Sequence, residues 1–343
     1  MRHLGMDVRK ITSTLHTADI LVIGFGAVLS GINLLFADRI EQWRFLVLIN
    51  INVSLLVCLL GYARHYSNSR IIRFVHDWYV AAIVFLSFKE LYFMIKPMHG
   101  GRDYDDVLTA IDQWMFGVNP TEWLIQFSHP ILTEVLQIAY TSFYFLFLVL
   151  GSELYRRHNP GLFHYFMFTI VYGFFLSYLG YFFLPAVGPR FTLHDFSLLD
   201  KDLPGVLLTP YLRWFVNAGG SVPMGGPNDL AIAGAQRDVF PSGHTMMTLV
   251  LIYLSTRFGA RVRYLIYVMG SLLIIATVYQ RYHYVIDLFA GAAFMVLCVW
   301  TSPRIYASIT SRFQTMEVCF RPAGGVAGAE SRSSGSSGRP LIG

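Results

Sequence analysis

Long apolar runs with few charged residues recur along the chain, and most Lys, Arg, Asp and Glu residues collect between them. A helix that crosses a bilayer core of roughly 30 Å needs about 20 residues, with about 17 as the lower limit. The runs lack the strict alternation of barrel strands, whereas helices satisfy their own backbone groups inside lipid. Eight runs reach or approach this length: 20–37, 45–62, 78–95, 131–150, 162–184, 245–256, 264–279 and 285–300. The pattern predicts an all-α integral membrane protein with about eight transmembrane helices.

The sixth run, 245–256, is too short for a full span, because it covers about 18 Å at the helical rise of about 1.5 Å per residue. If the basic residues between 257 and 263 anchor its cytoplasmic end, its other end lies below the outer membrane surface. A polar site at that end would meet a lipid headgroup without extracting the lipid.

The distribution of basic residues orients these helices. The N-terminal segment, the even-numbered loops and the C-terminal segment carry sixteen Lys and Arg, whereas the odd-numbered loops carry nine, mixed with many Asp. By the positive-inside rule, both termini are cytoplasmic and the long loops 96–130 and 185–243 face outward. The plasma membrane is the expected location, with the outward loops on the extracytoplasmic face.

Composition narrows the class of protein further. Of the 343 residues, 55% are hydrophobic and 14% are charged, whereas soluble domains carry about a quarter charged residues. A soluble enzyme is excluded, and nucleic-acid binding has no support because the basic residues are scattered singly. Cys58, Cys298 and Cys319 are too few for a disulfide framework. The Gly- and Ser-rich stretch after about residue 320 predicts a disordered cytoplasmic extension.

Three polar clusters interrupt the apolar runs. They read Pro-Ala-Val-Gly-Pro-Arg at 185–190, Phe-Pro-Ser-Gly-His-Thr at 240–245 and Arg-Tyr-His-Tyr-Val-Ile-Asp at 281–287. The predicted topology places all three at the outer membrane face, at the end of the fifth span, the start of the sixth and the start of the eighth. We therefore expect them to form one site.

The third and second clusters contain the groups that phosphoryl transfer needs. His283 and Asp287 are four residues apart and share a helical face, so the carboxylate can fix the imidazole tautomer and leave the other nitrogen as a nucleophile or base. Ser242 can cap a helix whose free amides, beginning at Gly243, would bind phosphate. His244 could protonate the leaving oxygen.

Arg190 and Arg281 supply planar, permanently charged forks that suit phosphate oxygens. Together with the histidines they predict a phosphoryl-transfer site that needs neither a metal nor a cofactor. A zinc site built from His244, His283 and either Asp238 or Asp287 is the alternative, although the chain lacks a close His-x3-His or Cys-x2-Cys pair. Lys89 and Glu90, inside the third run, remain without an assigned role.

Pro-Ser-Gly-His in the second cluster and His-x3-Asp after an Arg in the third resemble the type-2 phosphatidic acid phosphatase superfamily. This superfamily includes membrane lipid phosphatases, headgroup transferases of the inositol phosphorylceramide synthase kind and vanadate haloperoxidases. The resemblance covers about residues 78–302 and implies a six-helix catalytic core. Residues 1–77 would then add two N-terminal helices, and residues 303–343 a cytoplasmic segment.

The resemblance also implies roles for the site residues. His283 would attack phosphorus and form a phosphohistidine, Asp287 would orient it, and His244 would protonate the leaving alcohol. The phosphoryl oxygens would be held by Ser242, Gly243 and Arg281.

Two departures from the superfamily pattern leave the reaction open. Phe183 stands where the phosphatases usually carry a Lys, and Ala276-Thr277 stand where they carry Ser-Arg. Gly-Pro-Arg and Arg-Tyr-His-Tyr look more like the inositol phosphorylceramide synthase branch. The chain is therefore expected to be a lipid phosphatase or a headgroup phosphotransferase, acting on a lipid phosphate or phosphodiester in the bilayer. A transporter or binding protein on the same fold is the non-enzymatic alternative.

Overall fold

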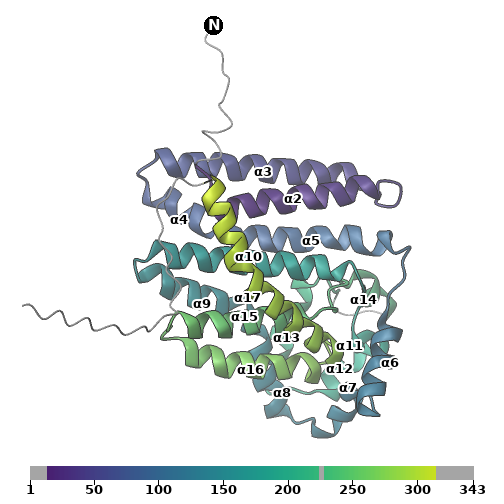
Figure 1. The fold of residues 1–343 in the computed structure, drawn as a ribbon. Helices are drawn as coiled ribbons and strands as arrows, with labels where there is room; N and C mark the ends of the chain where they lie inside the picture. Colours follow the sequence, from purple (N-terminus) through teal and green to yellow (C-terminus); the bar gives the residue numbers. More distant parts are fainter. Residues whose placement is uncertain (1–13, 224–227, 314–343) are drawn as a thin grey trace, which may run out of the picture.

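The computed structural model describes residues 14–223 and 228–313, and within them the chain is helical without a strand (Figure 1). Cys319 and the predicted disordered extension lie outside these residues. In chain order the helices are α2 (Thr17–Leu35), α3 (Trp43–Tyr66), α4 (Arg70–Trp78), α5 (Val80–Met98), α6 (Asp105–Phe116), α7 (Pro120–Trp123), η1 (Leu124–Phe127), α8 (Pro130–Thr141), α9 (Phe143–Arg156), α10 (Pro160–Tyr181), α11 (Pro189–Thr192), η2 (Phe196–Leu198), α12 (Leu199–Asp202), α13 (Thr209–Gly219), α14 (Asn228–Gly234), α15 (Gly243–Arg257), α16 (Arg263–Tyr279) and α17 (Val285–Phe313).

Five helical stretches among the described residues are long and apolar enough to cross a membrane: Thr17–Leu35, Trp43–Tyr66, Arg70–Met98, Pro160–Tyr181 and Val285–Arg312. Helices α8 and α9 form a sixth stretch that bends by 50° at a short break. Helices α16, with 17 residues, and α15, with 15, are shorter. These lengths establish several spans but not the predicted number of eight.

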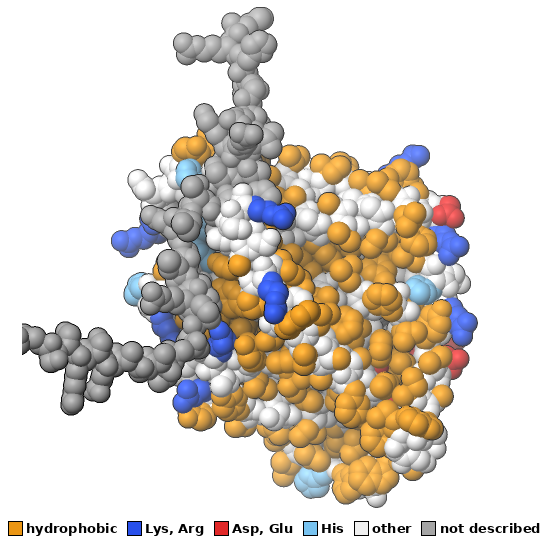
Figure 2. Space-filling view, viewed as in Figure 1, with side chains coloured by type: hydrophobic (Ala, Val, Ile, Leu, Met, Phe, Trp, Pro, Cys, Tyr) orange, Lys and Arg blue, Asp and Glu red, His pale blue; other side chains and the backbone are white. Residues whose placement is uncertain are grey.

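The surface between the two ends of the bundle is apolar. Figure 2 shows a broad belt of hydrophobic side chains, flanked by Lys and Arg toward the left and by charged side chains of both signs at the right edge. Large apolar side chains on the long helices, such as Leu55, Leu59 and Val296, are exposed. An apolar surface of this extent is not found on soluble monomers. The protein is an integral membrane protein.

Helix α10 forms the centre of the bundle. It packs against α2, α5, α9, α15 and α17, and 67% of its apolar window is buried, compared with 28% or less for the other long helices. Its sequence is hydrophobic all round, as expected for a helix surrounded by others.

The two adjacent charged residues of α5 face different parts of the molecule. Glu90 accepts hydrogen bonds from the side-chain amides of Asn50 (2.8 Å) and Asn33 (3.2 Å), which belong to the N-terminal helices α3 and α2. Lys89 donates to the Gly219 carbonyl and to the Ser221 hydroxyl next to α13. Glu90 therefore joins α2 and α3 to the bundle, whereas Lys89 lies beside the segments that cover one end of it.

Helix ends that are far apart in the sequence meet at that end of the bundle. Helices α10 and α16 finish there and α15 and α17 begin there, beneath the short helices α6, α7 and α11 to α14 (Figure 1). The three polar clusters occupy these helix ends. The chain therefore brings them to one end of the bundle, although more than 90 residues separate the first from the last.

Candidate active site

His283 lies in the turn between α16 and α17, where backbone hydrogen bonds fix its position. The amides of Tyr282 and His283 both donate to the Thr277 carbonyl, at 2.9 and 3.0 Å. The His283 side chain places Nδ1 3.0 Å from the Val239 carbonyl oxygen. A carbonyl only accepts, so Nδ1 carries the proton and Nε2 is the unprotonated nitrogen.

Asp287 lies beside the same imidazole but makes a different principal contact from the one expected. Its Oδ2 is 3.4 Å from His283 Nδ1, and the same oxygen accepts a 2.8 Å hydrogen bond from the Tyr284 amide. The hydrogen bond that selects the tautomer therefore goes to Val239. Asp287 caps the first turn of α17 and lies beside the ring.

His244 lies against His283. The ring centroids are 5.7 Å apart with the planes at 61°, and Tyr140 stacks on His244 at 4.7 Å and on Tyr282 at 4.2 Å. Within the described residues, the buried Nε2 of His244 has no hydrogen-bond partner. Two imidazoles 39 positions apart therefore meet, one fixed by a carbonyl and the other held between aromatic rings.

The start of α15 packs closely against its neighbours. Ser242 caps the helix, because its Oγ accepts from the Thr245 amide at 3.2 Å, and its own amide donates to the Asp287 carbonyl at 3.0 Å. A Cβ on Gly243 would lie 2.2 Å from the Tyr181 hydroxyl oxygen, and a Cβ on Gly291 would lie 2.6 Å from the Ser242 carbonyl oxygen. Only glycine fits at these positions, which lets α15 approach both α10 and α17.

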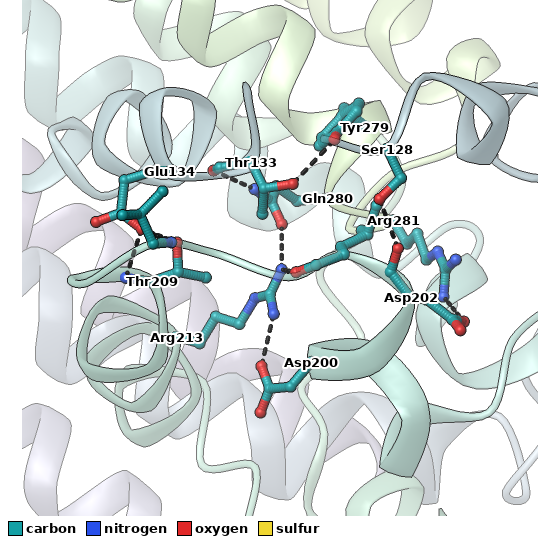
Figure 3. Close-up of polar contacts among 12 residues, drawn as sticks. Ser128, Thr133, Glu134, Asp200, Asp202, Thr209, Arg213, Tyr279, Gln280 and Arg281 are labelled. Atoms are coloured by element: carbon teal, nitrogen blue, oxygen red, sulfur yellow. Dashed lines mark hydrogen bonds and ion pairs between the residues drawn. The ribbon is translucent and has the colours of Figure 1, made fainter. Parts of the chain in front are cut away.

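The two arginines of the predicted site occupy different surroundings. Arg190 lines the cavity described below, and its guanidinium lies 4.8 Å from the Tyr282 ring centroid and donates to Asn217 Oδ1 at 3.0 Å. Arg281 is buried and forms an ion pair with Asp202 at 2.9 Å (Figure 3), and unlike Arg190 it does not line the cavity. The structure brings Arg190, but not the Arg281 side chain, to the site.

The backbone at Arg281 explains why its side chain does not reach the site. Its φ of 65° ends α16 in the left-handed region, and its carbonyl accepts from the Arg190 amide at 2.9 Å. The side chain leaves this turn toward α12 and α13, where Arg213 bridges Gln280 and Asp200 (Figure 3). Arg281 thus holds the turn that carries His283.

A cavity of about 240 Å³ opens beside His244. One end is lined by polar groups, including Arg190, Asp238 and Gly243, and the rest by apolar side chains from α5, α9 and α10. The apolar part is formed mainly by Val84, Phe85, Phe88, Phe147, Ile170 and Phe174. The arrangement suits a molecule with a polar head and a hydrocarbon chain.

The electrostatics of the site keep His283 neutral. Burial lowers the pKa of His283 to about 4, although the Asp238 carboxylate and the Val239 carbonyl act in the opposite direction. Burial also raises the pKa of Asp238, against the fields of His283, Arg190 and Lys89. A neutral imidazole is the form that can attack an electrophile. Among the described residues, no three His, Cys, Asp or Glu side chains are arranged as metal ligands.

Two aspartates of α6 were not identified from the sequence. Asp105 accepts from the amides of Val187 and Gly188 at 3.0 and 2.8 Å. Asp112 accepts from the amides of Val285 and Ile286 at 2.7 and 2.9 Å. Seven residues apart, the two carboxylates share one helix face and join the first cluster to the third. Their spacing on a helix was the available signal, but their partners are more than 80 residues away.

We expect Asp112→Ala to lower both stability and activity, because it leaves two partly buried amides at the start of α17 without their acceptor. Loss of such charged hydrogen bonds lowers the free energy of unfolding by about 1–3 kcal/mol. Displacement of the start of α17 also moves His283, which lies just before it in the chain. The expected result is a lower unfolding temperature and a roughly tenfold to hundredfold fall in kcat. Asp106→Ala is the matched control, because Asp106 is exposed on the same helix. Equal behaviour of the two variants would show that α6 does not position the site.

A family model described as the PAP2 superfamily matches residues 107–301, more than half of the chain. The chain belongs to the PAP2 superfamily. The matched PAP2 region runs from α6 to α17 and contains all three polar clusters, so the superfamily predicted from Pro-Ser-Gly-His and His-x3-Asp is confirmed. PAP2 superfamily members are generally phosphatases or phosphotransferases, which indicates an enzyme of this broad kind. No curated protein and no solved structure matches the chain.

Proposed function

We propose that this PAP2 superfamily member removes the phosphoryl group from a lipid phosphoester through a phosphohistidine on His283. The proposal is carried by one observation: two imidazoles lie 5.7 Å apart, His283 with its tautomer fixed and His244 with a buried Nε2 that has no partner among the described residues, and His244 lines the polar end of an apolar cavity. The products are a lipid alcohol and inorganic phosphate.

In the proposed first step, His283 Nε2 attacks phosphorus in line with the leaving oxygen. The P–O bond to the lipid breaks as the P–N bond forms, and His244 donates a proton to the departing alkoxide. Arg190 and the amides at the start of α15 stabilise the equatorial oxygens. In the second step, His244 takes a proton from water as the water oxygen attacks phosphorus. The P–N bond breaks, which releases inorganic phosphate and restores neutral His283.

The remaining site residues also have roles in this proposal. Asp287 helps to orient the His283 ring, Ser242 and Gly243 form the helix start that binds phosphate, and Arg281 positions the turn instead of contacting substrate. The chain would cross the membrane eight times, with a six-helix core at 78–302 after two extra helices within 1–77. Both termini, including residues 303–343, would be cytoplasmic, and the site would face outward at the plasma membrane.

A headgroup phosphotransferase of the inositol phosphorylceramide synthase kind is the second candidate. Burial of the nucleophile favours it, because only 3% of the His283 surface is exposed, and transfer to an alcohol requires that water be kept away from the intermediate. In that reaction the hydroxyl of a second substrate replaces water in the second step.

The test is an incubation of the purified protein with labelled lipid phosphomonoesters and phosphodiesters, with and without candidate alcohols. A lipid phosphatase releases inorganic phosphate from a monoester at a rate that added alcohols do not change. A transferase gives little phosphate until an alcohol is present and then forms a new phosphodiester. Activity that persists in EDTA is expected in both cases, whereas loss in EDTA with recovery on adding zinc would contradict the metal-independent mechanism. Absence of any lipid product would contradict the enzymatic proposal.

A further inference from the structure

A second polar hollow lies at the end of the bundle opposite the histidines. It has a volume of about 630 Å³ and is lined by residues from the end of α3, the start of α4, the end of α9 and the start of α10. Helix α10 separates the two places: it begins with Pro160 at this hollow and ends with Tyr181 beside Gly243. Its 22 residues span about 33 Å, so the hollow is not part of the candidate active site.

Basic side chains from separate segments converge on this hollow: Arg64, Arg70, Arg73, Arg156, His158 and His164. Among the described residues, Asp77 is the only acid that lines it, and Asp77 is already engaged by Arg64 at 3.2 Å and lies 3.8 Å from His164 Nε2. Positive charge is therefore in excess by three arginines before the histidines are counted. The positive-inside rule accounts for arginines in loops but not for their convergence on one concave site.

Two of these arginines have no partner that would occupy them. Arg70 and Arg156 make no hydrogen bond or ion pair with any of the described residues, whereas Arg73 donates to the Asn68 carbonyl at 3.0 Å. The start of α10 also faces the hollow through Asn159 and Pro160. Its positive end adds to the field of the guanidinium groups. These features together are those of an anion site that has room for a phosphate group and its substituent.

The walls of the hollow carry aromatic rings as well as charge. Tyr155 and Phe163 line it, with ring centroids 5.0 Å apart, and they lie at the ends of helices that are otherwise apolar. A site with guanidinium groups beside aromatic rings at a membrane boundary can hold the phosphate of an amphiphile while its chains stay in the lipid.

We propose that this hollow, defined by Arg64, Arg70, Arg73, Arg156 and the start of α10, binds a phosphate-bearing anion at the membrane face opposite the candidate active site. The phosphate could belong to an anionic phospholipid or to a soluble molecule, since both present the same group to the arginines. The proposal does not depend on the reaction at His283.

The test uses the full chain with Arg70→Gln/Arg156→Gln, which removes two charges without breaking any contact within the described residues. Arg257→Gln/Arg312→Gln is the matched control, because it removes two exposed charges from the same end of the bundle. Each protein is placed in phosphatidylcholine nanodiscs with or without phosphatidylglycerol, and its unfolding temperature is measured. Affinity for short-chain phosphatidylglycerol and for inorganic phosphate is measured in detergent.

We expect the hollow variant to bind the phosphate-bearing probe about thirtyfold more weakly than the wild type, and the control to bind as the wild type does. A loss restricted to phosphatidylglycerol identifies a lipid headgroup, and a loss that extends to inorganic phosphate identifies a soluble anion. Equal affinities in the hollow variant, the control and the wild type for both probes would overturn the proposal. Lipid phosphatase activity is scored separately, so failure of one proposal leaves the other intact.

Discussion

Replacement of His283 is expected to abolish turnover and to remove the covalent phosphoenzyme. The imidazole supplies the atom that attacks phosphorus, so no neighbouring group can substitute for it in His283→Ala. Loss of a nucleophile lowers kcat by about 10⁴-fold or more, leaving only the effect of substrate binding and oriented charges. The measurement is single-turnover labelling with a ³²P-lipid phosphate, followed by detection of acid-labile, base-stable phosphate on the protein.

A second substitution separates chemistry from folding. In His283→Asn, the side-chain amide can still donate to the Val239 carbonyl, which accepts from Nδ1 in the native protein at 3.0 Å. We therefore expect this variant to keep the wild-type unfolding temperature and yet form no phosphoenzyme. His65→Ala, at an exposed histidine on α3, should retain full activity. A His283→Asn protein that still turns over lipid phosphate would contradict the assignment of His283 as the nucleophile.

The parts of the site that depend on local sequence could be predicted. Two patterns fix the placement of side chains within one helical turn: a Ser before a helix, and a His and an Asp four residues apart. The structure has Ser242 at the start of α15 and Asp287 beside His283. The meeting of the second and third clusters followed from the order of the apolar runs, because alternating helices return the chain to the same end of the bundle. Local geometry and the order of the helices were therefore enough to predict that His244 and His283 lie close together.

The parts that depend on distant partners could not be predicted. Both arginines appeared equally suited to phosphate, but the left-handed turn at Arg281 and the distant Asp202 direct its side chain elsewhere. The Val239 carbonyl, rather than Asp287, accepts the hydrogen bond that fixes His283. Neither partner can be read from the sequence, because backbone carbonyls are present at every position and Asp202 is one of many acids in the long segments between the apolar runs.

The number of membrane spans could not be predicted reliably from the sequence, for a related reason. Apolar runs do not show where a helix will bend or stop: the fourth run divides into α8 and α9 with a 50° bend, and the sixth forms a helix of 15 residues. Short and bent helices around α10 are compatible with a bundle whose polar site lies below one surface. Hydropathy alone cannot distinguish that arrangement from a set of full spans.

The loss of activity on replacing His244 is expected to depend on whether the leaving oxygen needs a proton. Replacement of His283 should show no such dependence. An alkoxide leaves poorly unless it is protonated as the P–O bond breaks, whereas a nitrophenolate leaves without a proton. General acid catalysis contributes about 10²–10⁴-fold, so His244→Ala should lose that factor on an alkyl lipid phosphate and much less on a nitrophenyl phosphate ester. His283→Ala should lose activity on both.

The experiment measures kcat/KM for both substrates in the wild type, His244→Ala and Phe143→Leu. Phe143 packs against the His244 ring at 4.4 Å, so its replacement controls for altered packing around the imidazole and should affect the two substrates equally. Equal losses on both substrates in His244→Ala would contradict a role as general acid and assign His244 to binding or structure. A selective loss on the alkyl ester, with phosphoenzyme still formed from the nitrophenyl ester, would assign the proton transfer to His244. A structural defect would not produce this result, because it does not discriminate between leaving groups by their acidity.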